Sequence, residues 1–212
     1  MATIENRFFS GINGKFGPLV GYQWKGRQCL RALPMCNRDP RTEAQMAQRI
    51  RFGTLSRLGS MLMPAVKIGF RCAAIVGQTT EKNIFVKTNK QCITVEDGVA
   101  NIDYTSLKVA DGPLPTVDFG EPAMAADGTV SVAFSDYALG VDRHSYVVLA
   151  AHIPGQGLTL MSQPVFRTAG MVTLSLPQHC RASESHLYGF CWDGYTLASP
   201  SCHVGSLNTT CN

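Results

Sequence analysis

The chain has 212 residues, 45% of them hydrophobic and 16% charged, which is typical of a globular protein with a sizeable core. No stretch reaches the roughly 18 apolar residues that a membrane-spanning helix needs, and the opening MATIENRFFSGING has no signal-peptide core. We therefore expect no membrane partner and a cytoplasmic or particle-associated location.

The net charge of +4 conceals a strong asymmetry between the two halves of the chain. Residues 1–95 contain 15 Lys and Arg against 4 Asp and Glu, whereas residues 96–212 contain 4 against 11. Such a split predicts two functional halves, with the basic half facing an acidic partner. That partner is nucleic acid, an anionic surface, or the acidic half of another copy.

The first predicted elements are a β-hairpin and two helices. Residues 19–33 suit a hairpin that turns at Lys25-Gly26, with Val20, Tyr22 and Trp24 on one face of its first strand. Thr42-Glu43-Ala44-Gln45 matches a capping box, which predicts a helix from this point. A second helix is expected over residues 64–75, with Pro64 in its first turn.

From about residue 83 the apolar residues alternate, which is typical of strands. Turn signals such as Asp97-Gly98, Asp127-Gly128 and Asp193-Gly194 separate short predicted strands. The predicted strands cover residues 83–87, 107–110, 116–124, 129–134, 145–151, 158–164, 171–176, 186–192 and 197–205.

These elements predict an α+β fold that is mainly β. An N-terminal β-hairpin and two helices precede an antiparallel β-sandwich of immunoglobulin or fibronectin type. We expect a basic hairpin-plus-helices region at residues 1–82, a linker or first strands at 83–104, and the sandwich at 105–212.

The eight cysteines contain no C-x-x-C pair, so the strong zinc and redox signatures are missing. They are Cys29, Cys36, Cys72, Cys92, Cys180, Cys191, Cys202 and Cys211. Cys180, Cys191 and Cys202 recur every 11 residues beside His179 and His203, an arrangement in which zinc is conceivable. Small buried residues on neighbouring strands are the plainer interpretation, so we expect no metal, no cofactor and free thiols.

Catalytic signatures are also missing from the sequence. The histidines are His144, His152, His179, His186 and His203, and none lies in a recognised motif. The chain has no G-x-S-x-G, H-E-x-x-H, P-loop or G-x-G-x-x-G pattern. We therefore expect a protein that is not an enzyme.

Two stretches carry a family resemblance: GKFGPLVGYQWKGRQCLRALP, and NRDPRTEAQMAQRIRF with a later KIGF. In this order they resemble an uncharacterised domain-of-unknown-function family of gut bacteria and their mobile elements. Ile102-Asp103-Tyr104 and the stretch YGFCWDGYTLASPSCHVGSL extend the likeness. The resemblance implies an N-terminal motif region and a C-terminal sandwich, and it implies no established activity.

The basic half supplies the candidate binding residues. Arginine offers a planar fork for carboxylate or phosphate, and aromatic rings between the cations can stack on bases. The candidates are Tyr22, Trp24, Arg27, Arg31, Arg41, Arg49, Arg51 and Arg57. The plainer alternative is that the aromatic residues belong to the core and the arginines only solvate a helix face.

The leading hypothesis is a non-enzymatic structural or binding protein. It would self-associate as a homo-oligomer or dock to an acidic protein partner. A phage or mobile-element particle is one place where such a protein would act. The alternative is a nucleic-acid-binding protein that uses the basic half. The pairing of basic and acidic regions in one chain favours a protein partner.

Overall fold

The computed structural model describes residues 2–3, 11–36, 39, 41–136, 145–180 and 183–207. His144 and Cys211 lie outside these residues. The chain divides into two compact units, residues 1–42 and residues 43–212. The helices therefore share a unit with the later strands, whereas the sequence grouped them with the hairpin in residues 1–82.

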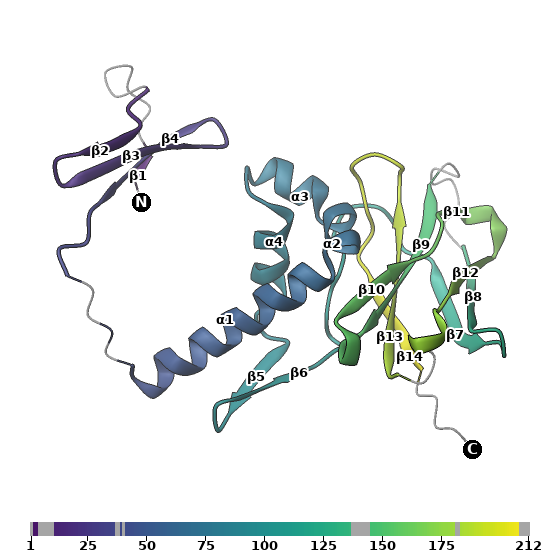
Figure 1. The fold of residues 1–212 in the computed structure, drawn as a ribbon. Coiled ribbons are helices and arrows are strands. Elements are labelled where there is room, and N and C mark those ends of the chain that lie inside the picture. Colours follow the sequence, from purple (N-terminus) through teal and green to yellow (C-terminus); the bar gives the residue numbers. More distant parts are fainter. Residues whose placement is uncertain are drawn as a thin grey trace. The chain divides into compact units, whose positions relative to one another are not determined.

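The N-terminal unit is an antiparallel sheet in the order β1–β4–β3–β2 (Figure 1). Its strands are β1 (Ala2–Thr3), β2 (Gly14–Phe16), β3 (Leu19–Trp24) and β4 (Arg27–Ala32). Lys25 and Gly26 join β3 to β4 with φ angles of 44° and 81°. Positive φ at both central residues suits the twist of a two-residue hairpin, and the predicted hairpin is confirmed.

Four α-helices lie in the described part of the second unit: α1 (Glu43–Met61), α2 (Met63–Gly69), α3 (Arg71–Val76) and α4 (Glu81–Thr88). Helix α1 begins directly after Thr42, as predicted. The predicted second helix is divided at Phe70, whose φ of −113° and ψ of 10° interrupt the helical backbone. None of the helices in these described residues is both long and apolar enough to cross a membrane.

The strand predicted over residues 83–87 is wrong, because these residues belong to α4. Thr80 caps this helix, and its hydroxyl oxygen accepts a hydrogen bond from the backbone N–H of Asn83 at 3.2 Å. Phe85 is fully buried and meets Phe70 edge-on, with ring centroids 6.3 Å apart. A short apolar run does not distinguish helix from strand by its period alone.

The described strands of the second unit form three antiparallel sheets. The hairpin β5 (Ile93–Glu96) and β6 (Val99–Ile102) makes the smallest. A three-stranded sheet has the order β12 (Met171–Ser175), β8 (Thr129–Ser135), β7 (Asp118–Met124). A five-stranded sheet contains β10 (Leu158–Met161), β9 (Tyr146–Ile153), β13 (Ser185–Trp192) and β14 (Cys202–Leu207), with β11 (Val165–Phe166) also paired to β9.

The five-stranded sheet is the middle layer of the second unit (Figure 1). Val147 and Leu149 of β9 pack with the three-stranded sheet, whereas Val148 and Ala150 pack with the helices on the other face. Successive residues of a strand point to opposite faces, so β9 is buried on both sides. The antiparallel, mainly β architecture is confirmed, and the helices cover one face of the sandwich.

Residues 107–110 were predicted as a strand, but they lie outside the strands of the structure. The buried Asn89 amide binds this segment: its Nδ2 donates to Lys108 O at 2.8 Å and its Oδ1 accepts from Lys108 N at 2.8 Å. Ser201 Oγ accepts from the N–H groups of Val109 and Ala110 at 2.9 and 3.2 Å. Side chains therefore supply the backbone partners that a neighbouring strand would provide.

A buried arginine ties together one end of the sandwich. The Arg167 side chain, 1% exposed, forms a bidentate ion pair with Asp136 at 3.0 and 3.1 Å. Its remaining N–H groups donate to the carbonyls of Pro115 and Thr116 and to the hydroxyl of Ser145, at 3.1, 3.2 and 3.4 Å. A buried guanidinium needs such full pairing, so Arg167 has a structural role.

Candidate functional site

The eight candidate binding residues lie in both units of the structure. Tyr22, Trp24, Arg27, Arg31 and Arg41 lie in the N-terminal unit, and the other three, Arg49, Arg51 and Arg57, lie on α1 of the second unit.

Four candidates share one face of the N-terminal sheet. Trp24 pairs with Arg27, and Val20 pairs with Arg31, across β3 and β4. Directly paired residues project from the same face of a sheet, as do residues two apart on one strand. Tyr22 therefore joins them, and so does Lys15, which pairs with Val20 from β2. We call Lys15, Tyr22, Trp24, Arg27 and Arg31 the basic–aromatic face.

The cations and Trp24 of the basic–aromatic face are exposed. Trp24 is 45% exposed, Tyr22 is half-buried, and all three cations are exposed. Cys29 pairs with Tyr22 and therefore lies on the same face, but it is buried, with 3% of its surface exposed. An exposed tryptophan among exposed cations is typical of a surface that another molecule covers.

Arg41 and Arg49 lie on the surface. Arg41, with a φ of 46°, pairs its Nε with Asp39 Oδ2 at 3.2 Å, and both side chains are well exposed. Exposed ion pairs of this kind contribute little to stability, about 0–1 kcal/mol. Arg49 is exposed on α1.

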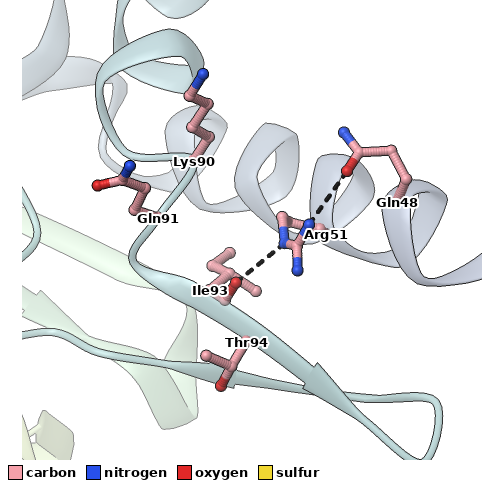
Figure 2. Close-up of a pocket in the computed structure, with 6 residues that line it drawn as sticks. All are labelled: Gln48, Arg51, Lys90, Gln91, Ile93 and Thr94. Atoms are coloured by element: carbon pink, nitrogen blue, oxygen red, sulfur yellow. Dashed lines mark hydrogen bonds between the residues drawn. The ribbon is translucent and has the colours of Figure 1, made fainter. Parts of the chain in front are cut away.

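Arg51 is bound within the second unit beside an open pocket of about 370 Å³ (Figure 2). Its Nε donates to Ile93 O at 3.1 Å and its Nη1 donates to Gln48 Oε1 at 3.2 Å. Lys90 and Gln91 also line this pocket, but their side chains point away from Arg51 in Figure 2. The pocket thus lacks convergent groups, and Arg51 ties α1 to β5.

Arg57 lies at a second, smaller pocket of about 180 Å³. Residues from α1, from the end of β6 and from the end of β9 form its walls. Its lining consists of Thr54, Arg57, Leu58, Met61, Ile102, Tyr104, His152 and Pro154.

A cluster of histidine and tyrosine rings adjoins the smaller pocket. The rings of Tyr104 and His186 stack with centroids 4.2 Å apart and an interplanar angle of 16°. His152 pairs with His186 across β9 and β13, and His203 lies 5.6 Å from His186. Both ring nitrogens of His186 are buried without a hydrogen-bond partner among the described residues. Burial lowers the pKa values of His186 and His203.

His152 is held neutral at neutral pH. Burial, with a smaller contribution from His186, lowers the pKa of His152 to about 4. Its Nδ1 lies 3.1 Å from Thr159 Oγ1, and the side chain is almost completely buried. His152 can therefore offer a hydrogen-bonding group to the pocket, but not a charge.

The comparison with protein families covers nearly the same residues as the described structure. A model described as a family of unknown function, DUF6266, matches residues 11–205. The chain belongs to this family. The match spans both units, and the resemblance to a domain-of-unknown-function family is confirmed. The search of curated proteins gave no match, and neither did the search of solved structures.

The cysteines of this DUF6266 member are free thiols at all seven described positions. Cys180 is buried and its thiol donates to Gln156 Oε1 at 2.9 Å, and Cys191 is also buried. Within the part of the chain that the structure describes, no group of three His, Cys, Asp or Glu side chains could hold a metal ion.

Sequence reasoning missed Tyr104 and His152 as site residues. Tyr104 follows β6 and His152 lies near the end of β9, so they approach α1 only in the folded unit. The one available signal was a histidine inside the apolar run VVLAAHI, where a buried imidazole is unusual.

Proposed function

We propose that the chain is a non-enzymatic structural or binding protein that docks to an acidic protein surface, including that of another copy. The observation that carries this proposal is the basic–aromatic face, where β3–β4 pairing places Tyr22 and Trp24 among three exposed cations. Arginine beside exposed aromatic rings is the composition typical of interface hot spots.

The acidic half of the chain supplies a complementary surface. Asp118 and Glu121 are exposed on β7, which hydrogen-bonds only to β8 among the described strands. Opposite potentials on two surfaces speed association and fix orientation. This complementarity supports a homo-oligomer, for which a phage or mobile-element particle is one setting.

A binding role also fits the chemistry of the face. Cationic and aromatic side chains recognise anionic and planar surfaces. The proposal keeps an immunoglobulin- or fibronectin-like sandwich as the scaffold of the second unit, and the two sheets that share one core support it.

Nucleic acid is the second candidate partner. Tyr22 and Trp24 lie two residues apart on one strand, with Arg27 and Arg31 beside them on the next. Aromatic rings that stack on bases inside a cationic surface are the usual means of binding single strands. The same face therefore serves both hypotheses, and only its partner differs.

The experiment compares a double charge reversal on the face with one elsewhere. Light scattering of the full chain should show oligomers that dissociate as salt rises, since salt screens exposed charges beyond about 10 Å at 0.1 M. Arg27→Glu with Arg31→Glu should abolish them. Lys67→Glu with Arg71→Glu, exposed on α2 and α3, changes the net charge equally and should not.

Gel retardation of single-stranded DNA and RNA distinguishes the partners. Retardation with a log affinity that falls by about 0.7 per phosphate per log unit of salt would favour nucleic acid. A chain that is monomeric at low salt, binds no acidic protein from its host and retards no nucleic acid would contradict the proposed function.

A further inference from the structure

The pocket beside Arg57 combines apolar walls with one cation. Helix α1 contributes Leu58, Met61 and Arg57, and Ile102, Tyr104 and Pro154 supply the other apolar surface of the lining. Pockets that bind small molecules are mostly apolar and contain a few polar groups that orient the ligand. Thr54, His152 and the hydroxyl of Tyr104 are the remaining polar side-chain groups of this lining.

We propose that this pocket binds a small organic carboxylate with a single apolar ring. Its volume of about 180 Å³ slightly exceeds the roughly 150 Å³ of an apolar cavity that holds benzene. A ligand with a single ring therefore fits this volume.

Arg57 determines the charge of the ligand. Its side chain is exposed, and it forms no hydrogen bond or ion pair with any described residue. The guanidinium fork is thus available for bidentate binding to a carboxylate. Because His152 is neutral, Arg57 is the one cationic side chain of this lining.

Tyr104 is held in place before any ligand binds. One face of its ring stacks on His186 at 4.2 Å, and its carbonyl accepts a hydrogen bond from Tyr188 Oη at 2.9 Å. The neighbouring carboxylate of Asp103 accepts hydrogen bonds from the hydroxyls of Thr105 and Ser106, each at 2.6 Å. A wall that is already ordered reduces the entropy that binding costs.

The test measures binding of benzoate and of benzyl alcohol to the full chain by NMR. The pocket lies within the second unit and shares no residue with the basic–aromatic face, so this test does not depend on the proposed docking function. We expect a Kd for benzoate on the order of 1 mM, as befits a fragment, with shifts confined to the pocket residues. Benzyl alcohol should bind more weakly, because it lacks the carboxylate.

Two variants and a control decide the outcome. Arg57→Gln should weaken benzoate binding about tenfold, the usual effect of losing a charged hydrogen bond, and leave benzyl alcohol unchanged. Thr54→Phe should fill the pocket and block both probes, whereas Arg49→Gln, also on α1, should change neither. Absence of benzoate binding, or equal losses in Arg57→Gln and Arg49→Gln with native circular dichroism, would overturn the proposal.

Discussion

Acid should destabilise the second unit through its buried histidines, and His152 allows the size of the effect to be worked out. The folded pKa of His152 is about 4, whereas an unfolded histidine has a pKa of about 6.5. Between these values the unfolded state binds more protons, so the free energy of unfolding rises with pH. Stability is therefore lost as the pH falls below about 6.5.

The expected loss from His152 alone is about 2 kcal/mol at pH 5 and about 3 kcal/mol at pH 4, relative to pH 7. His186 and His203 act in the same direction, because burial lowers their pKa values too. Such a loss is about an eighth to three-fifths of the 5–15 kcal/mol that typically stabilises a protein.

Urea unfolding followed by circular dichroism at pH 7 and pH 5 measures this effect. His152→Asn should be less stable than the wild type at pH 7, but it should lose about 2 kcal/mol less on acidification. His179→Asn removes an exposed histidine and should follow the wild type. Parallel pH dependences for the wild type and His152→Asn would refute the reasoning, because they would show that the fold does not hold His152 neutral.

Four further substitutions test the packing by urea unfolding at pH 7. Asn89→Ala should cost about 3 kcal/mol, because buried backbone groups lose their partner, and a loss below about 1 kcal/mol would contradict its role. Arg167→Met should cost about 3–5 kcal/mol, since it leaves the carboxylate of Asp136 unpaired, and a neutral effect would contradict the pairing. Gly53→Ala should stabilise α1 by about 0.5–1 kcal/mol, because its added Cβ meets nothing within 4 Å. Gly69→Ala should destabilise the protein strongly, because its added Cβ would clash with Val109 and Ala110. A Gly69→Ala variant more stable than Gly53→Ala would contradict the packing.

The elements that could be predicted from the sequence are those that depend on a few neighbouring residues. The sequence correctly predicted the turn at Lys25-Gly26 and the helix that begins after Thr42, because local side-chain and backbone preferences determine both features. Residues 83–87 were misassigned because an apolar run fits either period. Residues 107–110 were misassigned because Asn89 and Ser201, distant in sequence, provide their backbone partners.

The candidate sites were predictable to different degrees. Alternation along β3 placed Tyr22 and Trp24 on one face, and only strand register was needed to add Arg27 and Arg31. The smaller pocket was not predictable, because it requires α1 to pack beside the ends of β6 and β9. The roles of two candidate arginines depend on tertiary contacts that the sequence does not reveal. Arg51 donates a hydrogen bond to Ile93 O, and Arg57 borders the smaller pocket.

Hydroxyl-radical footprinting of the full chain tests the proposed docking most directly. Oxidation of Tyr22 and Trp24, read by mass spectrometry, should fall several-fold when the protein is concentrated at low ionic strength, and it should recover at high salt because screening separates the copies. Tyr195 of the second unit, 78% exposed, is the reference. If Tyr22 and Trp24 oxidise equally in dilute and concentrated protein, the basic–aromatic face does not dock to another copy, and the central claim fails for self-association.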